Sequence, residues 1–519
     1  MRRGPRDRVG SDAVRGNPRP RTVPGIRLGD LAARLTVAPS TSADPVVTGV
    51  THASQEVHPG DLYAALPGAR RHGAEFAAGA AAAGAVAILT DPAGAELAAG
   101  SGLPALVVAD PRAVLGTLAS AIYGDPTAQL LVIGVTGTAG KTSTAYLIES
   151  GLRAAGHTTG LIGTVETRLG ELVVDSVRTT PEATDLHAML AAARERGVTA
   201  VVMEVSSHAL AMGRVGGVRF AVGGWTNFGS DHLDFHSDTG DYFAAKARLF
   251  DGRCGVEVLN HDDPALKGLF TPATVSFSAA GDPAATWWAE HVDGAGYAQR
   301  FTAHGPDGLD LPAGVALPGR HNVSNALLAI AALVAAGVAA VTAAEGVAAC
   351  GGVPGRLESV GVVGGVRGVV DYAHKTDAIV AALAALRELS TGRLICVIGA
   401  GGDRDRGKRP MMGAASAEGA DVVVVTDDNP RTEDPAAIRA EVLAGAYRAG
   451  APARIVEVAG RRAAIDAAVR LAAPGDVVAV LGKGHERGQE VAGEVYPFDD
   501  RTELADALRA RFGDLEGSQ

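Results

Sequence analysis

Residues 130–155 contain the feature that most restricts the fold of this chain. An apolar run, Leu-Leu-Val-Ile-Gly-Val, leads into the glycine loop 137–142 (Gly-Thr-Ala-Gly-Lys-Thr), and residues 143–155 have helical character. A buried strand, a glycine loop and a helix in this order predict a parallel α/β sheet whose loop offers backbone N–H groups to phosphates. Lys141 would add a mobile cation, and Thr142 a hydroxyl for Mg²⁺. The loop is not a strict Walker A motif, because Val135 replaces its first glycine, and a glycine turn without nucleotide is the alternative interpretation.

The length of 519 residues exceeds what one hydrophobic core usually organises, so several domains are expected. The 68 glycines and an aromatic content of only 4% favour an α/β protein over an all-β one. We expect an N-terminal domain over residues 26–127, a central P-loop, parallel-sheet domain of ATPase-like type over 128–353, and a C-terminal Rossmann-like domain over 354–519. Residues 1–25, rich in Arg, Gly and Pro, are predicted to form a disordered basic tail.

Apolar runs between helical stretches mark the expected strands. The stretch from 282 to 313 is harder to assign and is interpreted as a β excursion. Strands are predicted at residues 200–204, 220–225, 368–372, 394–398, 422–426 and 477–481.

Charge and cysteine content restrict the class of protein. The formal net charge of −11 argues against a general nucleic-acid binder, which needs a basic face. For the arginine-rich tail alone, a nucleic-acid or membrane-surface role is the alternative. Three distant cysteines without metal-ligand spacing indicate reduced thiols in a cytoplasmic protein. The sequence has no stretch of 18 apolar residues free of charge and glycine, so no membrane span is predicted.

Acid, histidine and lysine side chains follow the predicted central strands. Glu204 ends one strand and could bind Mg²⁺, although a buried pair with an arginine would explain it equally well. The loop 227–236 concentrates histidines and acids, with solvated loop residues as the alternative. Lys246 lies in a helix with an apolar face, where a lysine usually extends to solvent.

Three charged loops follow strands of the C-terminal part, at residues 401–404, 428–431 and 482–486. Strand ends of a parallel sheet meet at one edge, so one pocket could contain all three loops. Its arginines could clamp a carboxylate in bidentate fashion, and Glu486 could receive an ammonium. An ordinary turn at Asn429 and Pro430 with solvated charges is the alternative.

The motifs Thr-Gly-Thr-Ala-Gly-Lys-Thr, Met-Glu-Val-Ser-Ser-His, Asp-His-Leu-Asp, Ala-Ala-Lys, Pro-Gly-Arg-His-Asn and Asp-Tyr-Ala-His, in this order, resemble the Mur ligase family over about residues 45–500. The resemblance implies ATP as co-substrate, Mg²⁺ as cofactor and a carbamylated Lys246 as a metal ligand. The implied catalytic residues are Lys141, His232 and Lys246, and the implied metal ligands are Thr142, Glu204, His232 and Lys246. The implied ATP contacts are Gly137, Thr138, Ala139, Gly140, Lys141, Thr142, Ser143, Asn322, Arg356, Asp371 and His374.

The resemblance also implies the other substrates. A UDP-N-acetylmuramoyl-dipeptide would contact Ser54, Ala69, Arg70, Arg71, Thr179, Thr180, Ser206 and Arg214. The sequence Asp-Asn-Pro-Arg is similar to that of members selecting meso-diaminopimelate, which would contact Arg404, Asp428, Asn429, Pro430, Arg431, Gly482 and Glu486. Departures from the family pattern occur at Ala53, Gln55, Arg178, Met212 and Lys375-Thr376.

The implied reaction is an ATP-driven amide ligation of peptidoglycan-precursor synthesis in the cytoplasm, through an acyl phosphate on the D-glutamate. No nucleic-acid partner is expected. Two other functions were weighed. A folylpolyglutamate synthetase shares the ATP chemistry but is disfavoured by the arginine of the Asp-Asn-Pro-Arg motif, and a nucleotide-binding switch module is disfavoured by the Lys246 segment and the amino-acid pocket.

Overall fold

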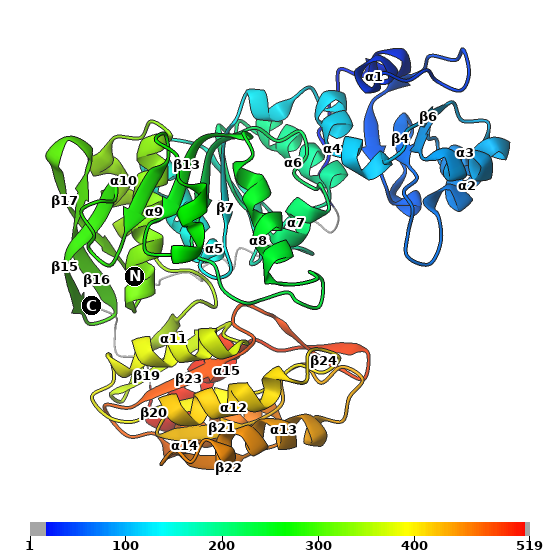
Figure 1. The fold of residues 1–519 in the computed structure, drawn as a ribbon. Coiled ribbons are helices and arrows are strands. Elements are labelled where there is room, and N and C mark those ends of the chain that lie inside the picture. The colour runs from blue at the N-terminus through cyan, green and yellow to red at the C-terminus, as the bar shows by residue number, and fades with distance from the viewer. Residues whose placement is uncertain (1–16, 514–519) are drawn as a thin grey trace, which may run out of the picture. The chain divides into compact units, whose positions relative to one another are not determined.

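The computed structural model describes residues 17–513. The chain divides into two compact units. The first contains the chain up to Ser276 together with Leu328–Gly346, and the second contains Phe277–Leu327 and the chain from Val347 onward. Figure 1 shows the elements of both units. Within the described residues, no helix is long and apolar enough to cross a membrane.

A small parallel sheet begins the first unit, with the strand order β3-β4-β5-β6. Alternate side chains of β5 enter different cores: Ile88 packs in the cluster that includes helix α2, and Leu89 in the cluster with α1 and α4. Figure 1 shows α2 and α3 beside these strands. The bounds are β1 Ile26–Arg27, α1 Leu28–Leu35, β2 Val46–Val47, β3 Gly49–Thr51, β4 Asp61–Ala64, α2 Ala77–Ala82, β5 Ala87–Thr90, α3 Pro92–Ala98, β6 Ala105–Val107 and α4 Pro111–Ile122.

Part of the predicted basic tail makes defined contacts. Residues 1–16 lie outside the described residues, but residues 17–25 contact the first unit. Arg19 Nη1 donates to both carboxylate oxygens of the buried Asp61 at 2.8 Å, and the backbone N–H groups of Arg21 and Thr22 donate to Glu195. Charge-assisted hydrogen bonds therefore fix the last part of a segment that composition alone marked as a tail.

A larger sheet carries the glycine loop. Its strands in the first unit have the order β10-β9-β8-β11-β7-β12-β13-β14, with β8, β11, β7, β12 and β13 parallel and β9 and β10 forming an antiparallel edge. Parallel strands end at a common edge, which brings the loops after β7, β11 and β12 together. The bounds are β7 Leu131–Thr136, α5 Lys141–Ala154, β8 Thr159–Ile162, β9 Thr167–Leu169, β10 Leu172–Val174, α6 Ala183–Glu195, β11 Ala200–Glu204, α7 Ser207–Ala211, β12 Phe220–Trp225, α8 Thr239–Ala247, β13 Cys254–Asn260, β14 Val275–Ser278, α9 Arg320–Ala335 and α10 Ala340–Ala348.

The predicted β excursion is confirmed in the second unit, as the antiparallel strands β15 (Trp287–Ala295), β16 (Ala298–Gly305) and β17 (Leu309–Val315). The C-terminal sheet has the order β18-β19-β23-β20-β21-β22. Helices α11, α12 and α13 share one core with it, and α14 and α15 share the other. The bounds are β18 Glu358–Val363, β19 Val366–Asp371, α11 Thr376–Arg387, β20 Leu394–Ile398, α12 Lys408–Gly419, β21 Val422–Val425, α13 Pro435–Arg448, β22 Arg454–Glu457, α14 Arg461–Leu471, β23 Val477–Leu481 and α15 Asp500–Phe512.

One strand of this sheet and one separate hairpin differ from the expected parallel arrangement. Strand β18 pairs antiparallel with β19, because Gly364 and Gly365 both adopt positive φ and close a two-residue hairpin. A second hairpin, β24 (Gly488–Val491) with β25 (Glu494–Pro497), follows β23 and was not predicted. Its strands are half-buried or exposed, so they lack the apolar pattern that marks a strand.

Candidate functional site

The glycine loop is held against the loop after β12. Gly137 has a φ of 142°, and a Cβ there would lie 1.8 Å from Thr226 Oγ1, so only glycine fits. Asn227 accepts hydrogen bonds from the backbone N–H groups of Thr138 and Ala139, at 2.9 and 3.0 Å. Thr226 Oγ1 donates to Ala139 O at 2.6 Å. The neighbouring strand end therefore sets the shape of the loop.

Two lysines meet at one carbonyl of this loop. Lys141 Nζ and Lys246 Nζ each donate to Gly137 O at 2.8 Å. Lys246, on α8, is only 1% exposed, and its Nζ lies 4.6 Å from the centroid of the Tyr242 ring. The expectation that this lysine extends to solvent is wrong. A shared acceptor places two amino groups beside the phosphate loop, where phosphoryl oxygens would carry negative charge.

Glu204 lies at the end of β11, fully buried next to the start of α5. Thr142 Oγ1 donates to its Oε2 at 3.0 Å, and Thr164 donates from its backbone N to Oε1 at 2.8 Å and from Oγ1 to Oε2 at 3.2 Å. The partners that fix this carboxylate are thus threonines, and the interpretation of Glu204 as the partner of an arginine is not supported by these contacts.

This pair of oxygen donors fits a magnesium ion. Among residues 17–513, no group of three or more His, Cys, Asp and Glu side chains could hold a metal by itself. Mg²⁺ characteristically binds through one or two carboxylates, water and substrate phosphates. Glu204 and the Thr142 hydroxyl beside a phosphate loop match that pattern.

The loop after β12 places a histidine group near Tyr242. His232 has a φ of 54°, and its Nε2 lies 3.2 Å from Asp231 Oδ2. The His232 ring is 4.7 Å from that of His208 in an edge-to-face arrangement, and burial lowers the pKa of His208. His236 is buried, with Nδ1 at 3.3 Å from Asp241. The interpretation of these histidines as solvated loop residues is therefore wrong for His236.

Several predicted dipeptide contacts gather around Glu204. Thr180 Oγ1 donates to the Glu204 carbonyl at 2.9 Å and accepts from Ser206 N at 3.1 Å. Thr179 Oγ1 lies 3.0 Å from Thr164 Oγ1. Four of the eight predicted contacts lie in this region, namely Thr179, Thr180, Ser206 and Arg214.

Arg214 is ordered by Glu182, a residue that the sequence did not indicate. Its Nη2 lies 2.9 Å from Glu182 Oε1, and Arg112 on α4 lies 3.4 Å from Glu182 Oε2. Arg214 also donates to Thr180 O at 3.3 Å and approaches Met212 Sδ at 3.4 Å. Burial lowers the pKa of Arg214, opposed by Glu182.

The N-terminal candidates make local contacts. Ser54 Oγ donates to Gln55 Oε1 at 3.0 Å, and Arg71 pairs with Glu75, four residues further on. Ala69 and Arg70 are exposed. The role of residues 69–71 in binding substrate remains a prediction.

The second unit contains the other predicted nucleotide contacts. Asp371 accepts from the backbone N–H groups of Leu357 and Ala373, at 2.6 and 2.7 Å, so it stabilises the local turns of the backbone. Burial raises the pKa of Asp371, opposed by Arg356. His374 Nδ1 lies 2.8 Å from Tyr372 O, and burial lowers the pKa of His374 to about 4, so its ring is neutral.

The remaining nucleotide candidates have comparable local roles. Asn322 Nδ2 donates to Pro318 O at 2.8 Å in the first turn of α9, and its Oδ1 accepts from Asn325. The Arg356 guanidinium lies 4.6 Å from the centroid of the Tyr372 ring. Capping and stacking explain these positions without excluding a ligand.

The three charged loops of the C-terminal sheet converge, as predicted. A Cβ on Gly402 would lie 1.9 Å from Pro430 O, so glycine permits the loops 401–404 and 428–431 to touch. Arg431 Nη1 donates to Gly402 O at 2.6 Å. Asn429 Nδ2 donates to Glu486 Oε2 at 2.9 Å, which joins the third loop. Arg404 is exposed at the edge of this pocket, and Gly482 lies against Asp428.

Buried ions that the sequence did not reveal support this pocket. Lys483 is fully buried and contacts Asn429 Oδ1 at 2.9 Å and Glu486 Oε2 at 3.0 Å. Arg461 on α14 pairs with Asp500 on α15 through two hydrogen bonds of 2.7 and 2.6 Å. It also donates to Leu481 O at 2.9 Å. A single charged residue in the sequence does not show which partner it will meet in the folded chain.

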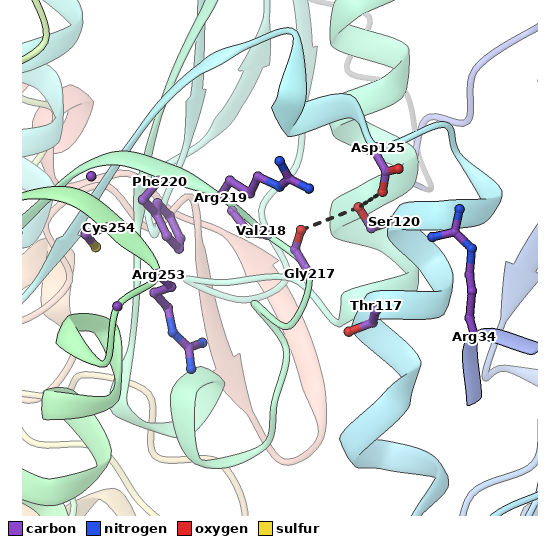
Figure 2. A pocket seen from close by; sticks show the side chains of 12 residues that line it. Arg34, Thr117, Ser120, Asp125, Gly217, Val218, Arg219, Phe220, Arg253 and Cys254 are labelled. Carbon is purple, nitrogen blue, oxygen red and sulfur yellow. Dashed lines mark hydrogen bonds between the residues drawn. The ribbon is translucent and has the colours of Figure 1, made fainter. Parts of the chain in front are cut away.

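A cavity of about 590 Å³ lies away from all of these residues. It opens at the beginnings of β12 and β13, whereas the phosphate loop follows the end of β7. Figure 2 shows Arg34, Arg219 and Arg253 around it, with a hydrogen bond between Ser120 and Asp125. None of the predicted site residues lines this cavity.

Comparisons with known proteins agree with the fold. Family models match in chain order: "Mur ligase family, catalytic domain" over residues 46–123, "Mur ligase middle domain" over 135–333 and "Mur ligase, glutamate ligase domain" over 355–484. Two relatives, from Streptomyces coelicolor and Streptomyces avermitilis, are 54% and 53% identical over 505 and 504 residues. Each match covers 96% of this chain and 99% of the relative, and both relatives are named UDP-N-acetylmuramoyl-L-alanyl-D-glutamate--2,6-diaminopimelate ligase.

A solved structure of a ligase with that same name is 31% identical and covers 90% of this chain and 95% of its own, with a TM-score of 0.65. The family models together match well over half of the chain, and the relatives match almost all of it. The chain therefore belongs to the Mur ligase family and is an ATP-dependent amide ligase.

Proposed function

We propose that this ligase adds meso-2,6-diaminopimelate to the D-glutamate of UDP-N-acetylmuramoyl-L-alanyl-D-glutamate in peptidoglycan-precursor synthesis. The observation that carries the proposal is the convergence of the loops 401–404, 428–431 and 482–486, which hydrogen bonds join into one cluster that includes Arg431 and Glu486. A site that binds an amino acid with a charged group at each end needs both a cationic and an anionic side chain. The names of the Streptomyces relatives support the same substrate.

In this proposal, the first unit activates the acid. Residues 137–143 bind the ATP phosphates, and Lys141 neutralises charge that develops on the transferred phosphoryl group. The γ-carboxylate of the D-glutamate takes the phosphoryl group, which yields an acyl phosphate and ADP. The amine of diaminopimelate then attacks the acyl carbon, and phosphate leaves through a tetrahedral intermediate. Asn322, Arg356, Asp371 and His374 are proposed as further nucleotide contacts from the second unit.

Magnesium is proposed at Thr142, Glu204, His232 and Lys246. Glu204 and Thr142 are already hydrogen-bonded to each other, so they would hold the ion with little rearrangement. When bound, Mg²⁺ neutralises phosphate charge during phosphoryl transfer. Lys246 could join this set only as a carbamate, because an ammonium repels a cation while a carbamate carries negative charge.

The N-terminal domain, residues 26–127, is proposed to hold the uridine part through Ser54, Ala69, Arg70 and Arg71. Arg214 and the hydroxyls of Thr179, Thr180 and Ser206 would bind the dipeptide, because arginine and hydroxyl groups suit its carboxylates. The residues proposed for diaminopimelate are Arg404, Asp428, Asn429, Pro430, Arg431, Gly482 and Glu486. We place the reaction in the cytoplasm, where ATP and nucleotide-linked precursors are available.

Phosphate release from the purified protein tests the proposed function. With ATP, Mg²⁺ and the UDP-muramoyl-dipeptide, meso-diaminopimelate should support turnover, whereas L-lysine and L-glutamate should give little. Omission of Mg²⁺ should abolish release in every case. Turnover with lysine but not with diaminopimelate would contradict the proposed amino acid, and turnover with glutamate on a folate would contradict the pathway.

Replacing Arg431 by asparagine should raise the KM for meso-diaminopimelate about 100-fold, because a charge-assisted bidentate contact with its distal carboxylate is lost. The kcat should change much less, since Arg431 is remote from the attacking amine. Steady-state phosphate release measures both constants. An exposed arginine of the same unit, Arg448, provides a matched control when replaced by asparagine. An unchanged KM would show that Arg431 is not the carboxylate clamp.

A further inference from the structure

The unpredicted hairpin β24–β25 forms one wall around Arg431. The backbone N–H of Arg431 donates to Glu490 O at 3.1 Å, and Ala492 N donates to Arg431 O at 2.7 Å. Arg431 has a φ of 51°, a conformation that these two bonds maintain. Gln489 Nε2 donates to Asp428 O at 2.6 Å. The hairpin, whose first strand is labelled in Figure 1, is therefore bonded directly to the Asp-Asn-Pro-Arg loop.

Glu490 on this hairpin contacts the Arg431 side chain. Glu490 Oε2 lies 3.1 Å from Arg431 Nε, while Arg431 Nη1 is used by Gly402 O. The Glu490 backbone is anchored through its N–H to Asn429 Oδ1 at 3.0 Å. These contacts orient the guanidinium and leave its Nη2 edge for an incoming carboxylate.

The Glu490 carboxylate retains capacity for a second donor. Its side chain is 39% exposed, and its contact with Arg431 involves a single oxygen. An ionised carboxylate has about four acceptor positions. A cationic group next to a carboxylate bound by Arg431 would therefore find Glu490 within reach.

The other acid of the pocket is already neutralised. Glu486 shares its Oε2 with the buried Lys483 at 3.0 Å and with Asn429 Nδ2 at 2.9 Å. Lys483 is fully buried, so a Glu486 that changed partners would leave a buried cation unpaired, which is costly. Glu490 is paired with Arg431, whose side chain is 21% exposed and would itself bind the incoming carboxylate, so Glu490 is the acid better able to change partners.

We propose that Glu490 is a specificity-determining residue that, together with Arg431, recognises a distal carbon carrying both a carboxylate and an ammonium. This inference rests on the proposed function. Arg431 binds the carboxylate, and Glu490 accepts the adjacent ammonium. The adjoining cation and anion match the zwitterionic distal centre of meso-diaminopimelate in charge.

Amino acids with only one distal charge fit this pair poorly. L-lysine brings an ammonium but no carboxylate, so Arg431 would repel it and stay unsatisfied. L-2-aminopimelate has the distal carboxylate without the ammonium, so Glu490 would lie beside a second carboxylate with no cation between them. Discrimination against each analogue is thus assigned to a different residue.

The test compares wild-type enzyme with Glu490→Gln on meso-diaminopimelate and L-2-aminopimelate by phosphate release. Glu490→Gln should raise the KM for diaminopimelate about tenfold, the usual effect of losing a hydrogen bond to a charged group. Its kcat should change less than about twofold, because the attacking amine is not involved. For aminopimelate, kcat/KM should stay the same or rise, so the preference ratio falls about tenfold.

Controls separate recognition from structure. Glu490→Asp retains the charge and should retain most of the preference. Glu494→Gln removes an exposed acid that accepts only from Tyr496 on the same hairpin and should behave as wild type. If Glu490→Gln lowers kcat/KM equally for both substrates, Glu490 merely holds Arg431 and the inference is wrong. An unchanged ratio overturns it as well.

The same assay shows whether the premise fails. If the wild-type enzyme prefers diaminopimelate and Glu490→Gln keeps the same preference ratio, only the role of Glu490 is refuted. Wild-type enzyme that does not use diaminopimelate refutes the proposed function itself. If Glu490→Gln does not show the unfolding transition of the wild-type enzyme, the inference is tested with Glu490→Asp and with the wild-type enzyme. Calorimetry then measures the binding of both amino acids to the wild-type enzyme, and equal affinities would contradict the inference.

Discussion

Replacing Lys246 by alanine should lower kcat by on the order of 10²- to 10³-fold, and added formate should restore part of the lost rate. Lys246 is buried and donates to Gly137 O, the same carbonyl that Lys141 contacts. If the functional form is a carbamate, the missing group is an anion, and a small carboxylate entering the space left by the side chain can replace it. Phosphate release with increasing formate measures the effect.

Two further variants decide between an anionic and a cationic role for Lys246. Lys246→Arg keeps a cation that cannot form a carbamate and should be as inactive as the alanine variant, with no response to formate because the space is filled. Lys267→Ala removes an exposed lysine and should leave kcat unchanged. High activity of Lys246→Arg would show that the positive charge itself acts in the reaction.

Replacing Asp500 by alanine should destabilise the second unit by about 3–5 kcal/mol. Both Asp500 and Arg461 have 0% of their side chains exposed, and their two hydrogen bonds measure 2.7 and 2.6 Å. Burial alone would lower the pKa of Arg461, but the pair with Asp500 raises it above its ordinary value. The guanidinium also stays charged in the variant, because arginine is too basic to lose its proton in a protein. Without Asp500, the buried Arg461 guanidinium keeps only a longer contact with Asp428, at 3.7 Å, so its charge is poorly compensated.

Denaturant unfolding of wild type and variant measures this loss of stability. Asp506→Ala is the matched control, because Asp506 lies on the same helix, pairs with Arg509 and is 50% exposed. A surface pair of this kind contributes about 0–1 kcal/mol. Equal unfolding midpoints for the two variants would contradict the prediction.

The strands that position the site were predictable because each is a short apolar run ended by polar residues. Ala200–Glu204 and Leu394–Ile398 are confirmed at the predicted bounds. The burial of Lys246 was not predictable, because helical spacing shows that a lysine faces the core side but not whether a carbonyl such as Gly137 O waits there.

Pairs between distant charges were also beyond sequence reasoning. Arg461 and Asp500 are 39 positions apart, and Arg214 and Glu182 belong to different elements. The 488–497 hairpin was missed for another reason, since its strands are polar and partly exposed and are held by hydrogen bonds to the 428–431 loop. The order of local motifs indicates which chemistry to expect, while the partners that tune each charge emerge only in three dimensions.

The β24–β25 hairpin places one wall of the amino-acid pocket on a ten-residue segment that contains none of the residues proposed to handle ATP or metal. Its contacts with the rest of the pocket pass largely through backbone atoms of Arg431 and Asp428. Side chains on the hairpin can therefore vary during evolution while the backbone bonds persist. Selectivity for the incoming amino acid and the capacity to activate an acid can thus be inherited separately.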